Sequence, residues 1–172
     1  MARGYTARMK RPPAIEGELD ARELRFAIVA SRFNESVVER LIDGAFEALR
    51  DHGADPARLE LIRVPGAFDL PLVVRKIAES GRADAIVALG AVIRGETAHF
   101  EYIASACADG LSRVAGDTGV PVAFGVLTTS DEDQARERAG GREGNRGADA
   151  ARAAIELASL IRKLSRHLEQ KG

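Results

Sequence analysis

The sequence predicts a three-layer α/β sandwich, in which helices cover both faces of a four-stranded parallel sheet. Two observations predict it. Short apolar runs typical of strands alternate along the chain with longer segments whose apolar residues recur at helical spacing, as in successive βαβ units. One of these runs, residues 83–93, is almost continuously apolar, which suits a central strand covered on both faces.

Four segments are predicted to form the strands: residues 24–31, 59–64, 83–93 and 120–127. Pro121 lies near the start of the fourth segment, where a missing hydrogen-bond donor costs least. Residues 15–19 are a candidate for a short additional strand at an edge of the sheet. Because crossovers between parallel strands are right-handed, few other arrangements remain, and we expect a small flavodoxin-like sandwich.

Helices are predicted between the strands. The first has a stripe of apolar residues at helical spacing, namely Val38, Leu41, Ile42, Ala45, Phe46 and Leu49. Asn34 is its candidate N-cap, and Gly53 ends it. A second helix is expected over residues 68–79 and is closed by Gly81. The third ends near Gly116 and has one apolar face, formed by Phe100, Ile103, Ala104, Cys107, Leu111 and Val114.

After the fourth strand we expect a short helix around residues 131–139 and a long helix over residues 148–167. The long helix has apolar positions that are expected to face inward, namely Ala151, Ala154, Ile155, Ala158 and Ile161. Residues 14–172 are therefore expected to form a single domain. The preceding residues 1–13 are basic but lack the apolar core of a signal peptide, and we expect a flexible arm.

The composition is that of an ordinary soluble globular protein. The formal net charge is −1, which gives no electrostatic reason to expect a nucleic acid partner. The sequence holds no apolar run of about 20 residues that could span a bilayer, so no membrane partner is expected. Cys107 is the only cysteine, so no internal disulfide can form, and a reducing cytoplasmic location is expected. The three scattered histidines and one cysteine show no metal-ligand spacing.

Candidate ligand-binding residues follow the predicted strands, because open α/β sheets bind ligands beyond the carboxyl ends of their strands. The most informative segment is residues 93–99. Gly95 permits a tight turn there, and the following helix N-terminus offers unpaired N–H groups to an anion. Thr97 can cap that helix or donate its hydroxyl to a phosphate, and His99 can carry out acid–base chemistry near neutral pH. The alternative is that Thr97 only caps and that His99 is an ordinary surface residue.

Other segments add weaker signals. Phe33 and Phe68 follow strand ends, where an aromatic ring can stack on a flat heterocycle or can belong to the core. Phe124 lies within a strand, and its pattern predicts a core residue. Asp69 can accept hydrogen bonds from a sugar or a uracil, or can cap a helix. The glycine-rich residues 140–147, together with the arginine at position 138, form either a phosphate cradle or a solvated connection.

Taken in order, these segments resemble the lumazine synthases of riboflavin biosynthesis, over about residues 15–161. The resemblance rests on RFN at residues 32–34, VPGAFD at 64–69, GAVIRGETAHFE at 90–101, FGVLTT at 124–129 and ERAGGREGNRG at 137–147. It implies a transferase that condenses 5-amino-6-(D-ribitylamino)uracil with 3,4-dihydroxy-2-butanone 4-phosphate. The products are 6,7-dimethyl-8-ribityllumazine, phosphate and water, and the resemblance implies neither a cofactor nor a metal.

The resemblance also implies a role for individual residues. His99 and Arg138 are the expected catalytic residues, with His99 moving protons and Arg138 binding the phosphate. Phe33 stacks on the pyrimidine. The remaining expected substrate contacts are Ala67, Phe68 and Asp69 for the ribityl chain, Ala91, Val92 and Ile93 for the uracil, Glu96 and Thr97 for the butanone phosphate, and Phe124. In this family the residues corresponding to Phe124 and Arg138 come from a neighbouring subunit.

The family resemblance finally implies an assembly. Lumazine synthases form homopentamers, and some close into icosahedral shells of 60 subunits. Residues 140–147 carry no insertion, which favours the shell, and association with riboflavin synthase is a further implied partner. Two alternatives remain: a riboflavin-pathway paralogue with little turnover, and a cage subunit used for its assembly. A flavodoxin-like electron carrier is disfavoured, because residues 31–34 are not a phosphate loop rich in Ser, Thr and Gly.

Overall fold

The computed structural model describes residues 11–171. Its main sheet has four strands in the order β2-β1-β3-β4, and all three neighbouring pairs are parallel. The strands are β1 (Phe26–Ser31), β2 (Leu59–Val64), β3 (Ala85–Ile93) and β4 (Val122–Thr129). The strand order reverses between β1 and β3, as in flavodoxin-like folds, so the predicted fold class is confirmed.

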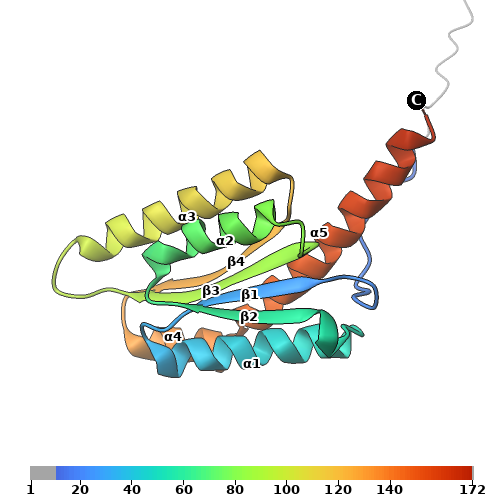
Figure 1. The fold of residues 1–172 in the computed structure, drawn as a ribbon. Coiled ribbons are helices and arrows are strands. Elements are labelled where there is room, and N and C mark those ends of the chain that lie inside the picture. The colour runs from blue at the N-terminus through green and yellow to red at the C-terminus, as the bar shows by residue number, and fades with distance from the viewer. Residues whose placement is uncertain (1–10, 172) are drawn as a thin grey trace, which may run out of the picture.

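Helices form a layer on each face of this sheet (Figure 1). On one face lie α1 (Glu35–Asp51), α4 (Glu132–Arg138) and α5 (Arg146–Glu169), and on the other α2 (Leu70–Glu79) and α3 (His99–Thr118). Two short 3-10 turns, η1 (Pro56–Arg58) and η2 (Ala67–Asp69), flank β2. The glycine-rich residues after α4 form an antiparallel hairpin of β5 (Ala139–Gly141) and β6 (Gly144–Asn145).

The core has two halves, one on each face of the sheet, and both depend on the buried central strands. Every residue of β1 is buried, and so is every residue of β3 except the last. The helix α5 packs closely on α1 because residue 147 is a glycine: a Cβ there would lie 2.0 Å from the Leu41 carbonyl oxygen. Asn145 caps α5 through Oδ1, and its Nδ2 donates a 2.7 Å hydrogen bond to the Arg40 carbonyl oxygen. This close packing fixes the β5–β6 hairpin against α1.

The predicted elements are present, with shifted ends. The second strand matches over residues 59–64, whereas β1 and β3 begin two residues later than expected and β4 is displaced two residues toward the C-terminus. The expected helix over residues 68–79 begins as η2 and becomes α2 at Leu70. The long helix extends beyond residues 148–167 at both ends.

Two predictions of the sequence are wrong in this region. Residues 15–19 form no strand; they run beside α5, where the Glu18 backbone N–H donates a 3.1 Å hydrogen bond to Ser159 Oγ. Ile161 does not face inward, because it is 43% exposed. The C-terminal part of α5 extends past the sheet (Figure 1). Of the predicted N-terminal arm, residues 1–10 lie outside the described residues. Within residues 11–171, no helix is both long and apolar enough to cross a membrane.

Candidate functional site

A cavity of about 300 Å³ lies at the carboxyl ends of β1, β2 and β3. It is built from the loop after β1, the turn after β2, the end of β3 and the start of α3. Eight of the residues predicted for the site line it: Phe33, Ala67, Phe68, Ala91, Val92, Ile93, Thr97 and His99. The fold therefore brings together side chains that are up to 66 positions apart in the sequence, from Phe33 to His99.

Two aromatic rings give the cavity its exposed apolar surface. Phe33 is 71% exposed and Phe68 is 61% exposed, so neither ring belongs to the core of the chain. Exposed phenyl rings beside a cavity provide flat faces on which a heterocycle can stack. Ala91, Val92 and Ile93 add the last backbone groups of β3, which is where a parallel sheet presents N–H and C=O groups to a ligand.

The segment before α3 differs from its prediction. The helix begins at His99, its N-cap residue is Ala98, and no side chain caps it. The expectation that Thr97 caps this helix is therefore wrong, since the helix begins one residue too late for it. Thr97 lines the cavity instead, together with His99, and the N-terminal end of α3 lies beside them. A helix N-terminus carries unpaired N–H groups that favour anions.

Asn34 also differs from its prediction. It occupies the N-cap position of α1, but its side chain makes no capping hydrogen bond. Its Nδ2 donates a 2.9 Å hydrogen bond to the Ala91 carbonyl oxygen in β3, and the residue lines the cavity. The sequence placed Asn34 in a strand-end segment and gave its side chain a helix-capping role, but nothing in its spacing indicated a partner 57 positions away.

Four predicted residues do not line this cavity. Glu96 is an exposed loop residue beside it. The Asp69 side chain bonds to the backbone of the turn that precedes it: its Oδ2 accepts a 2.9 Å hydrogen bond from the Gly66 N–H. Phe124 is 48% exposed in β4, so the prediction of a core residue is wrong: β4 is an edge strand, which helices cover less completely than a central strand. Arg138 ends α4, where Nη1 donates a 3.2 Å hydrogen bond to the Gln134 carbonyl oxygen.

Arg138 lies in a separate, wide hollow formed by α4 and the hairpin after it. Arg142 also lines this hollow, where it is paired with Glu137 at 3.2 Å. Hydrogen bonds from the Arg142 backbone and guanidinium lower the pKa of Glu137. The glycine-rich residues thus form a defined hairpin between α4 and α5, with Gly140 and Gly144 at positive φ, and residues 140–144 are exposed.

Phe100 and Ile103 line the cavity although the sequence analysis placed both on the apolar face of a helix, and Gly66 and Gly95, which belong to the predicted site segments, line it as well. The spacing of His99, Phe100 and Ile103 places them on neighbouring positions of one helix turn, a signal that was available and was assigned to the core. Phe100 and Ile103 do pack partly against the core, so each contributes both to the core and to the wall of the cavity.

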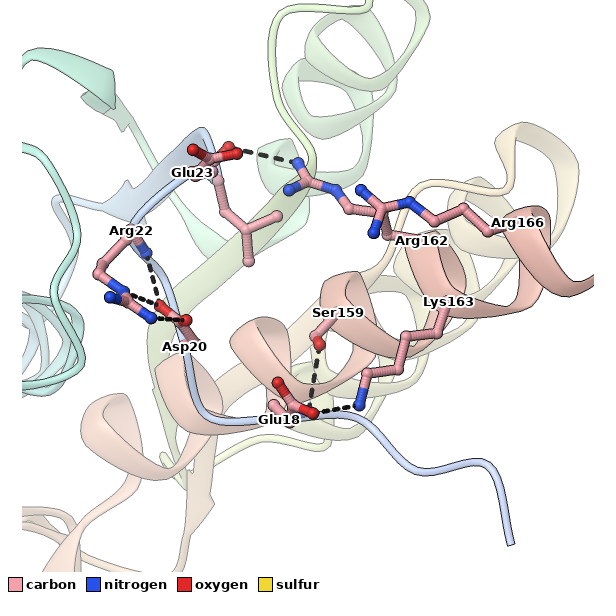
Figure 2. A pocket seen from close by; sticks show the side chains of 9 residues that line it. Glu18, Asp20, Arg22, Glu23, Ser159, Arg162, Lys163 and Arg166 are labelled. Atoms are coloured by element: carbon pink, nitrogen blue, oxygen red, sulfur yellow. Dashed lines mark hydrogen bonds and ion pairs between the residues drawn. The ribbon is translucent and has the colours of Figure 1, made fainter.

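A larger hollow, about 440 Å³, lies between residues 18–24 and the later turns of α5 (Figure 2). Its charges are largely satisfied by one another: Lys163 Nζ contacts Glu18 Oε1 at 2.6 Å, and Arg22 pairs with Asp20 at 2.6 Å. Hydrogen bonds from the Arg22 side chain and backbone lower the pKa of Asp20 to about 2. None of the predicted site residues lines this hollow, and it lies away from the carboxyl ends of the strands.

Two further groups bear on the chemistry. Burial raises the pKa of the Cys107 thiol to about 11, so this cysteine stays a thiol near neutral pH and is not a nucleophile. Within residues 11–171, no three His, Cys, Asp or Glu side chains are grouped so as to hold a metal ion. The groups that border the cavity are a histidine, a hydroxyl, the Asn34 side-chain amide, backbone amides and aromatic rings.

The doubly wound sheet and a cavity at its switch point define an α/β protein that binds a small molecule at the carboxyl edge of its sheet. The sequence model of the 6,7-dimethyl-8-ribityllumazine synthase family matches residues 23–162, and the chain belongs to that family. This membership confirms the resemblance drawn from the sequence, and with it the expectation of a transferase of riboflavin biosynthesis.

Curated relatives agree with the family match. The chain is 54% identical over 150 residues to the 6,7-dimethyl-8-ribityllumazine synthase of Halorhodospira halophila (strain DSM 244 / SL1). It is 51% identical over 150 residues to the 6,7-dimethyl-8-ribityllumazine synthase of Nitratidesulfovibrio vulgaris, in strain DP4 and in strain Hildenborough. Each alignment covers 87% of this chain and 96% of the relative.

Proposed function

We propose that the cavity beside Phe33 and His99 is the site at which this chain condenses 5-amino-6-(D-ribitylamino)uracil with 3,4-dihydroxy-2-butanone 4-phosphate. The observation that carries the assignment is the shared lining: two exposed rings, the end of β3, a histidine and a helix N-terminus all border one cavity. The aromatic rings match the flat pyrimidine, the backbone groups of β3 match its polar edge, and the helix N-terminus matches the anionic phosphate.

The pyrimidine stacks on Phe33, and its polar edge meets the backbone of Ala91, Val92 and Ile93. The ribityl chain extends along Ala67 and Phe68 toward Asp69, whose carboxylate holds the Gly66 turn. Thr97, Glu96 and the N-terminal turn of α3 receive the butanone phosphate. Holding both substrates in one cavity converts a bimolecular encounter into a reaction between neighbours, which supplies much of the rate enhancement.

His99 moves protons in this scheme. The 5-amino group of the uracil adds to the ketone and water leaves, which forms an imine. A proton is then lost from the hydroxyl-bearing carbon beside the imine as the C–O bond to phosphate breaks, which leaves an enol. The enol takes up a proton at its terminal carbon and becomes a ketone, and the ribityl-bearing nitrogen closes the ring on this new carbonyl carbon with loss of a second water. Each step needs a proton taken from or given to nitrogen or oxygen, a task suited to an imidazole at the cavity wall.

The site is completed by a second copy of the chain. A cavity of about 300 Å³ is at the small end of the range for ligand sites, and neither Phe124 nor Arg138 lines it. Phe124 is 48% exposed in β4, and Arg138 lies in the separate hollow beside α4. We therefore propose that Phe124 and Arg138 of a neighbouring subunit close the cavity, and that Arg138 binds the leaving phosphate.

An oligomer is also supported by exposed apolar groups on α2 and α3. Leu72 is 67% exposed and Tyr102 is 74% exposed, and large apolar side chains exposed on two neighbouring helices provide surface that a second subunit can cover. We propose a homopentamer in the cytoplasm, and a closed shell of pentamers because the β5–β6 hairpin carries no insertion. We also propose an association with riboflavin synthase, which only the family resemblance supports. Light scattering separates the two sizes, and pentamers alone would contradict the shell.

The shared site is tested by mixing two inactive variants. His99→Ala and Arg138→Ala are each expected to lower turnover sharply when assembled alone. When the two chains are co-expressed and co-assemble at random, about a quarter of the shared sites receive both native residues, so activity returns to about that fraction. Lumazine fluorescence measures the rate, and the singly assembled variants are the controls.

Two outcomes would contradict the proposal. If mixing restores nothing although mixed oligomers form, then the two residues do not meet across an interface. If the wild-type protein gives no rate above the spontaneous reaction, then this chain lacks the condensation activity, and the alternatives of a cage subunit or an inactive paralogue return.

A further inference from the structure

Asn34 has an unusual backbone conformation. With φ 58° and ψ 46° it lies in the left-handed region, and within residues 11–171 it is the one non-glycine residue with positive φ. Asparagine tolerates this region better than most residues, but it adopts it at a cost. At an N-cap position its side chain would ordinarily offset that cost by capping the helix, and here it does not.

The side chain of Asn34 instead reaches a different strand. Its Nδ2 donates a 2.9 Å hydrogen bond to the carbonyl oxygen of Ala91 in β3. The parallel pairing of β1 with β3 ends at Ala30 and Leu89, so Ala91 lies beyond the last pair. The amide of Asn34 therefore links the two strands after their backbone ladder has ended, at the point where the strand order reverses.

This hydrogen bond acts next to Phe33. The Phe33 ring is 71% exposed, so its position depends on the backbone that carries it and little on side-chain packing. On the β2 side that backbone is held by hydrogen bonds from Arg32 N–H to the Val64 carbonyl at 2.8 Å and from Phe33 N–H to the Pro65 carbonyl at 3.1 Å. On the β3 side, the loop is held by the hydrogen bond from the Asn34 side chain to the Ala91 carbonyl oxygen.

We infer that Asn34 is a positioning residue for the pyrimidine substrate: its amide holds the Phe33 loop at a fixed distance from the end of β3. A flat ring fits between Phe33 and the strand only while that distance is kept. Without the hydrogen bond, the loop is attached to β2 alone and the stacking face is free to move away. The inference rests on the proposed function, because it takes Phe33 as the surface on which the pyrimidine stacks.

Two variants separate the amide from the backbone conformation. Asn34→Gly keeps the positive φ without strain and removes only the side chain. Asn34→Asp keeps the size of the side chain but places a carboxylate oxygen against the Ala91 carbonyl oxygen. Titration calorimetry with 5-amino-6-(D-ribitylamino)uracil is expected to show affinity weakened about three- to tenfold for the glycine variant, as for loss of one hydrogen bond, and weakened further for the aspartate variant. The KM for the butanone phosphate should stay within about twofold.

A double-mutant cycle with Phe33→Ala provides the readout that a merely structural role would not give. If Asn34 acts through the Phe33 ring, Asn34→Gly should change pyrimidine affinity by less than about twofold once the ring is absent. Equal losses in the presence and absence of the ring would overturn the inference. So would an Asn34→Gly variant that binds the pyrimidine as tightly as the wild-type protein.

The same titration distinguishes this inference from the proposed function. If the wild-type protein does not bind the pyrimidine, both fail. If the wild-type protein binds it and Phe33→Ala does not, while the Asn34 variants are unchanged, the proposed site stands and only the positioning role is overturned. The glycine variant keeps the test informative if the aspartate variant does not fold.

Discussion

The two ends of the main sheet carry hollows of nearly equal size, but they differ in what lines them. The hollow at the amino ends of the strands has a volume of about 280 Å³ and the one at the carboxyl ends about 300 Å³. The amino-end hollow is bordered by Arg25, Arg82 and Glu60, whereas Phe33 and Phe68 border the other. Volume therefore does not distinguish a binding site from a surface depression in this molecule, and the lining does.

At the amino end, the charged groups are satisfied by the chain itself. Arg25 Nη2 contacts Asp84 Oδ1 at 2.9 Å, and the Arg25 backbone N–H donates a 2.8 Å hydrogen bond to the same carboxylate. Arg82 pairs with Glu60 at 3.3 Å. At the carboxyl end, by contrast, large apolar rings stay exposed within the chain. Satisfied charges contribute to stability, whereas exposed rings gain their energy only when another molecule covers them.

The largest expected effect is on Phe33, at the carboxyl end. Replacing it with alanine removes a stacking face worth about 1 to 3 kcal/mol to a bound base, so kcat/KM for the pyrimidine should fall about five- to 150-fold. The free energy of unfolding should change by less than about 0.5 kcal/mol, because the ring is 71% exposed. Steady-state kinetics and urea titration measure the two quantities.

Leu168→Ala is the matched control for Phe33→Ala. Leu168 is 68% exposed and lies near the end of α5, away from both hollows, so its loss should leave catalysis unchanged. A Phe33→Ala protein that loses stability but keeps its kcat/KM would reverse the contrast between the two ends of the sheet.

The next effect is on Asp84, at the amino end, and it should appear in stability alone. The Asp84 carboxylate accepts hydrogen bonds from the Arg25 backbone and guanidinium and is 25% exposed. Asp84→Ala should lower the free energy of unfolding by about 1 to 2 kcal/mol, since it leaves the Arg25 N–H without its acceptor. Asp84→Asn keeps a side-chain oxygen for that N–H and should lose less, while KM for both substrates stays unchanged in either variant.

The Asp84 contribution should also depend on pH. Burial raises the pKa of this carboxyl, but the hydrogen bonds and charge of Arg25 outweigh burial and leave the pKa below its ordinary value. The stabilisation is therefore fully present above pH about 4, the pKa of an unfolded aspartate, and is lost as the pH falls through the lower folded pKa. The stability difference between wild type and Asp84→Asn should shrink in acid, and a difference that grows there would contradict the assignment.

The sequence predicted the sheet and the site segments because both follow from local patterns. The almost continuous apolar run before residue 93 identified the central strand, and the carboxyl-end rule then selected the segments around Phe33, Ala67 and His99. The predicted strands began two residues early because Leu24, Ala83 and Val120 are apolar, and the fourth ended early because Thr128 and Thr129 are polar. Such ends depend on tertiary pairing, which local patterns do not record.

The contact made by the Asn34 side chain and the missing cap at Thr97 could not be predicted from the sequence for a different reason. Both residue types are common helix caps, so local statistics favoured that role for each. In the structure the Asn34 amide contacts Ala91, 57 positions away. The helix α3 has Ala98 as its N-cap residue, so Thr97 lies one residue before the capping position. Ile161 was likewise placed inward by helical spacing, which cannot show where a helix leaves the sheet that it covers.

The smallest expected effect is on the other amino-end pair, Arg82 with Glu60. The pair is bound at 3.3 Å, but the two side chains are 65% and 46% exposed, so water screens their attraction and ordering them costs entropy. Glu60→Ala should therefore change the free energy of unfolding by less than about 0.5 kcal/mol in urea titration, and less again in high salt. Glu60→Gln, which keeps the shape of the side chain, is its matched control. If Glu60→Ala lowers the free energy of unfolding as much as Asp84→Ala does, then burial and the backbone hydrogen bond do not make the Asp84 pair more stabilising than the Glu60 pair.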